Sequence, residues 1–101
     1  MAVNATTAEQ AEKTVKFAAD RNISLTIKAT GHDFQGRSTS KDKLTLWIHY
    51  MKNVTYVDDW TASGCDGYEP TKAIQVLGGD QWVDVYKIAD ANNVVVVGGN
   101  A

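Results

Sequence analysis

The sequence has little that could cross-link the chain, give its surface a large net charge or embed it in a membrane. Its 101 residues include a single cysteine, Cys65, so no disulfide can form within the chain. The formal net charge is -2, which provides no basic surface for nucleic acid or for an anionic membrane. The longest apolar run, Val94–Val97, is much too short to span a bilayer. The beginning of the chain lacks the basic and apolar regions of a signal peptide, so the sequence gives no localisation.

Metal and thiol chemistry also have little support. The two histidines, the one cysteine and the scattered carboxylates show no metal-ligand spacing, so we expect no metal site. Cys65 lies in residues 58–70, a stretch rich in Gly, Asp and Ser that holds the only proline and is interpreted as a variable loop. We expect its thiol to be free or paired with another molecule. The composition, with 44% hydrophobic residues, suits one small globular domain with a modest core.

Hydrophobic periodicity predicts an α+β fold that begins with a β-α-β unit. Residues 2–4 are expected to form a short strand. A capping box at Thr6, or alternatively at Thr7, should start a helix that ends near Arg21. Asn22 suits a left-handed residue after the helix, and the alternating run Ile23–Lys28 predicts the second strand. The helix face expected to turn inward consists of Ala8, Ala11, Val15, Ala18 and Ala19.

Further strands and a second helix complete the expected small mixed sheet with two main helices. Asp80 is expected to cap a helix that runs to about Asn92. Trp82 and Tyr86 share its apolar face, which favours core packing over cofactor stacking for both. The other residues of that face are Val85 and Ala89. The predicted strands are Leu44–Ile48, buried on both faces, Val54–Val57, Lys72–Leu77 and Val94–Val97. No linker or internal repeat marks a domain boundary.

The chain is organised around the turn that follows the Ile23–Lys28 strand. Its sequence is Ile27-Lys28-Ala29-Thr30-Gly31-His32-Asp33-Phe34-Gln35-Gly36-Arg37-Ser38. Gly31 can adopt positive φ, and successive backbone N–H groups in such a turn can form a nest for an anion such as phosphate. Lys28 adds positive charge, and His32 lies at the tip. The turn matches neither G-x-G-x-x-G nor a Walker loop, because Lys28 precedes the glycine. On these residues alone, a solvated surface turn remains the alternative.

Three segments share an order and spacing with a known family. Lys28-Ala29-Thr30-Gly31-His32-Asp33, with Gly36 and Ser38, resembles a pyrophosphate loop. Gly78-Gly79-Asp80-Gln81-Trp82-Val83-Asp84-Val85-Tyr86 resembles a Gly-x-Gly-x-x-Trp-Gly-x-x-Tyr stretch. Val94-Val95-Val96-Val97-Gly98-Gly99 resembles a strand and glycine pair that reach a flavin ring. The family is the vanillyl-alcohol oxidase class of flavoproteins, in particular its berberine-bridge-enzyme-like members. The resemblance identifies residues 1–101 as the N-terminal part of their PCMH-type FAD-binding domain.

This resemblance implies FAD as the cofactor. It also implies that His32 bonds covalently to the 8α-methyl group of the flavin ring, which tethers the cofactor and raises its reduction potential. Members with a second covalent link carry a cysteine after the glycine pair. Ala101 stands at or next to that slot, so His32 alone should hold the flavin. The cofactor-binding residues implied are Lys28, Ala29, Thr30, Gly31, His32, Asp33, Gly36, Ser38, Gly98 and Gly99.

Complete members of the family oxidise a substrate by hydride transfer to the flavin and then pass the electrons to O2. They continue with the rest of the FAD domain and a substrate-binding domain, so we expect residues 1–101 to be incomplete for catalysis and name no catalytic residue. The expected partner of the complete protein is an unknown small-molecule substrate. Such relatives are often secreted, which would make the sequons at Asn4, Asn22 and Asn53 relevant. The alternatives are a non-catalytic remnant, or a small phosphate- or nucleotide-binding module.

Overall fold

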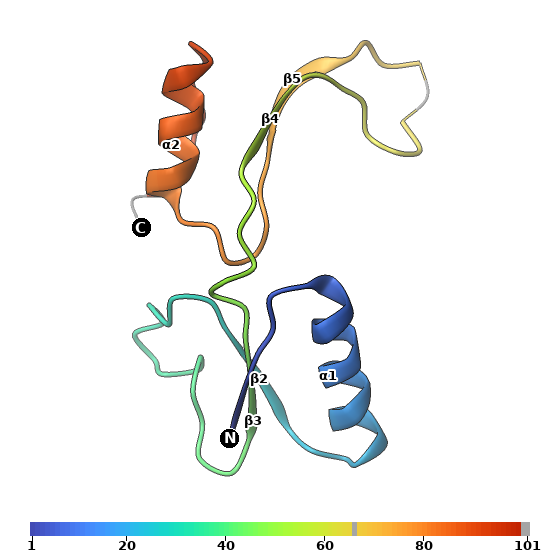
Figure 1. Cartoon of the computed structure of the whole chain (residues 1–101), viewed down its shortest axis with the longest axis vertical. Helices are drawn as coiled ribbons and strands as arrows, with labels where there is room; N and C mark the ends of the chain where they lie inside the picture. The colour runs from blue at the N-terminus through green and yellow to red at the C-terminus, as the bar shows by residue number, and fades with distance from the viewer. Residues whose placement is uncertain (66, 100–101) are drawn as a thin grey trace.

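The computed structural model describes residues 1–65 and 67–99. Within these ranges the elements follow the order β1-α1-β2-β3-β4-β5-α2. Figure 1 shows β1, β2, β3 and α1 at one end of the molecule, and β4, β5 and α2 at the other. The α+β fold with two main helices is therefore confirmed. The strands divide between one parallel and one antiparallel sheet, however, instead of forming the single mixed sheet expected from the sequence.

The first sheet is parallel and places β3 in the centre. The strands β1 (Ala2–Asn4) and β2 (Leu25–Lys28) both pair with β3 (Leu44–Trp47), which gives the order β1-β3-β2. The helix α1 (Ala8–Asp20) connects β1 to β2 and packs against β3. The buried apolar residues of this half are Ala5, Ala18, Leu44 and Leu46. The β-α-β start is confirmed, with a third strand inserted between its two strands.

The second sheet is an antiparallel hairpin. It consists of β4 (Thr55–Trp60) and β5 (Thr71–Gln75), and α2 (Trp82–Ala91) packs against β4. Val85 and Ala89 are the buried residues of α2. The strand β4 continues through residues 58–60, which the sequence assigned to a loop, because Trp60 pairs with Thr71 of β5 after a register shift. The predicted loop is correspondingly shorter.

Gly79 lies where the segment before α2 contacts the connection between β3 and β4. It is buried, and its N–H donates to the Met51 carbonyl oxygen at 3.0 Å. A Cβ atom at this position would collide with the Ile48 carbonyl oxygen and would lie 2.7 Å from that of His49 and 2.8 Å from that of Met51. Only a glycine lets the segment that leads into α2 lie this close to the connection between β3 and β4.

The start and inward face of α1 test the sequence reading in detail. Thr7 is the N-cap, and its hydroxyl oxygen accepts from Gln10 N at 3.3 Å. The Gln10 side chain reaches back to Thr6 N at 2.8 Å, so both threonines take part in the cap. The predicted inward face is only partly right. Ala11 is half-buried and Ala18 buried, whereas Ala8, Val15 and Ala19 are exposed.

Thr14 is buried on the inward face of α1, where Val15 was expected. A buried hydroxyl group requires a hydrogen-bond partner. The Thr14 hydroxyl donates to the Gln10 carbonyl oxygen at 2.8 Å, so it can be buried without an unpaired polar atom. Asn22 has φ 53°, which confirms the left-handed residue after the helix.

Two further predictions for the second half are wrong. Asp80 does not cap α2, because Gln81 is the N-cap and makes no side-chain cap bond. The Asp80 carboxylate instead accepts from Leu77 N at 2.7 Å and from Asn53 N at 3.1 Å. The run Val94–Val97 forms no strand within the described residues, and Val95 and Val97 are almost fully exposed. High β propensity gives a strand only where another strand is available to pair with it.

Candidate functional site

The predicted cofactor loop begins at the carboxyl edge of the parallel sheet. Lys28 is the last residue of β2 and is in register with Trp47, the last residue of β3. The Lys28 carbonyl oxygen accepts from Ile48 N at 2.9 Å, which fixes the point where the loop leaves the sheet. In Figure 1 this loop, residues 29–43, projects from the end of β2 before the chain returns to β3. Ligands of open α/β sheets commonly bind outside the carboxyl ends of the strands.

Gly31 has the backbone conformation predicted for it. Its φ is 90°, in the left-handed region that side chains rarely adopt. A Cβ atom at Gly31 would lie 2.7 Å from Lys28 Cε and 3.5 Å from Lys28 Nζ. The lysine side chain therefore folds over the turn, and its ammonium group lies beside the backbone of Gly31.

The tip of the loop presents backbone donors. In the part of the chain that the structure describes, the N–H groups of residues 31–34 donate to no protein acceptor. The residues Gly31, His32 and Phe34 are exposed, so the tip is open to a ligand. Successive unpaired N–H groups beside an ammonium group are a suitable donor set for the oxygens of a phosphate or diphosphate. The residues present thus fit an anionic cofactor group.

Asp33 and Arg37 close the second half of the loop. The Asp33 carboxylate accepts from Arg37 N at 2.6 Å, and its two oxygens accept from the Arg37 guanidinium at 2.7 Å (Nη2) and 3.1 Å (Nε). Gly36, with φ 72°, donates through its N–H to the Asp33 carbonyl oxygen at 3.0 Å. The hydrogen bonds from the Arg37 side chain, and then from its backbone, lower the pKa of Asp33 below its ordinary 3.8 and raise the pKa of Arg37.

An aromatic cluster supports the start of the loop. The Trp47 indole nitrogen donates to the Ala29 carbonyl oxygen at 3.1 Å. His49 stacks on Trp47 with ring centroids 5.7 Å apart, and Tyr50 meets Trp47 edge-on at 5.2 Å. Sequence reasoning missed this support. The aromatic residues Trp47, His49 and Tyr50 follow one another closely at the end of a predicted strand, which is a signal, but nothing in the sequence shows the bond to Ala29.

The glycine pair lies against α2. The nearest atoms to a Cβ placed on Gly98 or on Gly99 belong to the Trp82 indole, and the Tyr86 hydroxyl donates to the Gly99 carbonyl oxygen. Trp82 and Tyr86 stack with centroids 5.9 Å apart. Trp82 is half-buried and Tyr86 is exposed, so the expectation that both belong to the core is only partly met.

The predicted site residues therefore form two groups. Ala101, at the slot of a second flavin link, lies outside the described residues. The first group is the continuous loop of Lys28, Ala29, Thr30, Gly31, His32, Asp33, Gly36 and Ser38. The second group is Gly98 and Gly99, which contact Trp82.

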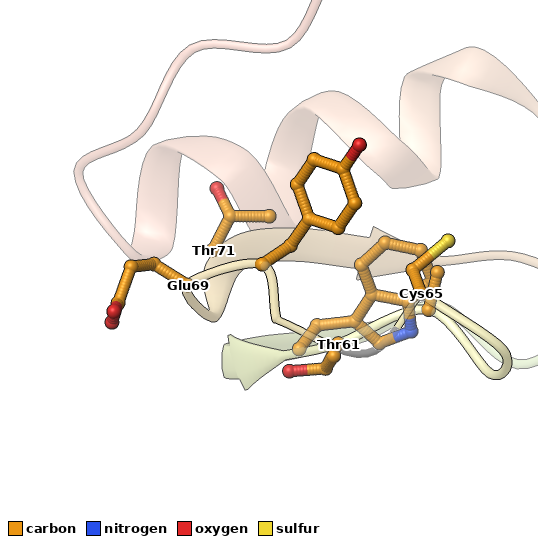
Figure 2. A pocket seen from close by; sticks show the side chains of 7 residues that line it. Thr61, Cys65, Glu69 and Thr71 are labelled. Atoms are coloured by element: carbon orange, nitrogen blue, oxygen red, sulfur yellow. The ribbon is translucent and has the colours of Figure 1, made fainter.

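A separate hollow lies at the far end of the β4–β5 hairpin. Figure 2 shows Thr61, Cys65, Glu69 and Thr71 around it, and its volume is about 300 Å³. Cys65 is exposed. Over the described ranges, His, Cys, Asp and Glu side chains nowhere gather in threes that could hold a metal ion. Within residues 1–65 and 67–99, no helix is long and apolar enough to cross a membrane.

Known proteins resemble this chain over almost its whole length. The family model described as FAD binding domain matches residues 1–100. The FAD-linked oxidoreductase patO of Aspergillus clavatus is 38% identical over 96% of the chain, which corresponds to 16% of patO. The VAO-type flavoprotein oxidase VAO615 of Thermothelomyces thermophilus is 33% identical over 96% of the chain and 16% of its own length. The crystal structure of the VAO-type flavoprotein MtVAO713 from Myceliophthora thermophila C1 superposes with a TM-score of 0.84, at 42% identity, and covers 97% of this chain and 18% of that one.

The family model and the structural match define a flavin-binding class of protein. The chain belongs to the FAD-binding domain family, and within it to the N-terminal part of the domain found in VAO-type, FAD-linked oxidoreductases. FAD is the cofactor of this family. The chain spans about a sixth of the length of the relatives it matches, 16 to 18%.

Proposed function

We propose that the loop Lys28–Ser38 holds the diphosphate of FAD and that a ring nitrogen of His32 would bond covalently to the 8α-carbon of the flavin. The imidazole N–H and one 8α C–H bond would break as the N–C bond forms, and the two electrons and two protons released would pass to dissolved O2, which gives H2O2. The observation that carries this proposal is the row of unpaired N–H groups at residues 31–34, with the Lys28 side chain folded over Gly31. This donor set suits an anionic group, and FAD, the cofactor of the family, carries one in its diphosphate.

Each predicted residue then has a physical task. Lys28 offsets the negative charge of the diphosphate, and Gly31 supplies the left-handed turn that brings successive N–H groups together. Gly36 lies within the turn that the ion pair of Asp33 and Arg37 closes, and Ser38 directly follows that turn. His32 is exposed at the tip, where its ring nitrogen is free to bond to the cofactor.

The glycine pair has a second task in this proposal. The Trp82 indole occupies the side of Gly98 and Gly99 on which a Cβ atom would lie, and both glycines are exposed, so their backbone can offer its other side to a flat ring. FAD itself supplies the hydride-accepting ring. The chain's own residues bind and orient the cofactor.

For the complete protein we propose an FAD-linked oxidase that acts on a small molecule. The relatives named FAD-linked oxidoreductase and flavoprotein oxidase support this reading. The chain covers 16% of each of those two relatives. We propose that the substrate pocket lies in the part of the complete protein outside this chain.

The test uses the purified 101-residue chain incubated with FAD. We expect a yellow protein whose colour stays with the pellet after acid precipitation, because a covalent bond survives unfolding. His32→Ala should release the colour into the supernatant. His49→Phe, a control at the chain's other histidine that keeps an aromatic ring next to Trp47, should retain it.

Other outcomes would change the proposal. A protein that binds FAD but releases it on denaturation would overturn the covalent bond and leave the diphosphate site. Equal affinity for ADP and for FAD would favour a nucleotide-binding module. A chain that binds neither would be a remnant without the proposed function.

A further inference from the structure

The Asp33 carboxylate places a negative charge on the loop that is proposed to bind a diphosphate. Asp33 carries one of the unpaired N–H groups of residues 31–34, so its charge lies close to any anion held there. An uncompensated carboxylate at this place would repel the diphosphate and weaken its binding. Lys28 supplies a positive charge on the other side of Gly31, but it does not pair with Asp33 within the described residues.

Arg37 compensates the Asp33 charge directly. Its Nη2 lies 2.7 Å from one carboxylate oxygen and its Nε 3.1 Å from the other, which is a bidentate arrangement. The Asp33 side chain is 20% exposed and that of Arg37 is 75% exposed, so the guanidinium covers the carboxylate and faces solvent itself. A lysine would supply the charge but not the planar fork.

The Asp33 carboxylate also stabilises the shape of the loop. It accepts the backbone N–H of Arg37 at 2.6 Å and so closes the turn of residues 33–37 behind the unpaired donors. The loop therefore uses an acidic side chain to hold its shape, and this acidic side chain needs a cation before an anion can bind nearby.

We propose that Arg37 is a positioning residue that neutralises Asp33 and thereby lets the Gly31 turn accept a diphosphate group. The proposal rests on the proposed function in that the diphosphate is assigned to FAD. It goes further in giving a role to Arg37, which no motif of the sequence singled out. Arg37 acts through Asp33 and does not itself contact the reacting part of the cofactor.

The chain offers a matched control. Lys13 and Glu9 form an ion pair on α1 with the same four-residue separation, and their N···O distance of 2.7 Å equals that of Arg37 and Asp33. Lys13→Ala therefore removes a surface ion pair of the same spacing on α1, outside the loop. It should leave anion binding unchanged.

The experiment measures binding of inorganic pyrophosphate by calorimetry and of FAD by flavin fluorescence, in the full chain. Arg37→Ala should weaken both by about tenfold, the order of magnitude expected for one unpaired charge beside a diphosphate. The double variant Asp33→Asn/Arg37→Ala should recover to within about threefold of wild type, because the repelling charge is gone. Asp33→Asn alone, which frees the arginine, should bind pyrophosphate about threefold tighter or more.

The pattern across variants decides the matter. Affinity in the double variant as low as in Arg37→Ala would show that Arg37 acts only by shaping the loop and would overturn the proposal, as would unchanged binding in Arg37→Ala. If Arg37→Ala does not fold, weaker binding by Asp33→Asn overturns the proposal and tighter binding upholds it. A wild-type chain that binds pyrophosphate in this Arg37-dependent way but does not bind FAD would refute the proposed function alone. A wild-type chain that binds neither would refute both.

Discussion

Gly79 is the position where we expect an added methyl group to lower the free energy of unfolding most. Its N–H donates to Met51, and the segment from Ile48 to Met51 passes directly over its Cα atom. In Gly79→Ala the new Cβ would lie 2.7 and 2.8 Å from two carbonyl oxygens and closer still to a third. These oxygens belong to the backbone, so no side-chain rotation relieves the overlap.

The magnitude follows from this geometry. Overpacking a well-packed site costs about 1–3 kcal/mol, and an overlap with backbone falls at the upper end, so we expect Gly79→Ala to lower the free energy of unfolding by about 3 kcal/mol. For a domain of this size, this corresponds to a melting temperature lower by roughly 15 °C. Thermal and urea unfolding followed by circular dichroism measure both quantities.

Gly36→Ala is the control for backbone strain alone. Gly36 has φ 72° and no atom within 4 Å of an added Cβ, so its substitution should cost only about 1 kcal/mol. If Gly79→Ala melts within about 2 °C of wild type, or is no worse than Gly36→Ala, the close contact between the two halves does not exist as described.

Three further substitutions or conditions test individual contacts. Trp47→Phe removes the indole donor to Ala29 and should cost about 1 kcal/mol in urea unfolding, with faster amide exchange in the following loop. Asp80→Ala removes the shared acceptor of two backbone N–H groups and should cost about 1–2 kcal/mol, with Asp80→Asn in between. Because the pKa of Asp33 is lowered in the folded state, its bonds to Arg37 should persist above its ordinary 3.8 and be lost as the pH falls through the lowered value. An NMR titration in which the Asp33 carboxyl group has a midpoint at or above 3.8 would contradict this.

Much of the fold follows from local pattern. The alternation of Ile23–Lys28 and the apolar run of Leu44–Ile48 predicted β2 and β3, and helical spacing predicted α1 and α2. The failures share a physical cause, which is that tertiary contacts decide between local alternatives. Val94–Val97 has the composition of a strand, but the described residues give it no partner. Aspartate is a common N-cap residue, but the Asp80 carboxylate accepts from the backbone N–H groups of Asn53 and Leu77 instead.

The candidate site divides in the same way. Positive φ at Gly31 follows from the turn composition and is confirmed. Asp33 and Arg37, an acidic and a basic residue four positions apart, form an ion pair. Their spacing could have predicted this ion pair, but the sequence analysis did not use it. The bond from Trp47 to Ala29 and the contact of Gly98 with Trp82 join residues distant in the sequence, so only the structure reveals them.

The most direct test of the central claim is a peptide map of the chain after incubation with FAD and denaturation. We predict one flavin adduct, on the peptide that contains His32, and no adduct in His32→Ala. An adduct on any other peptide, or none in a wild-type chain shown to bind FAD, would contradict the assignment of His32 as the covalent attachment site.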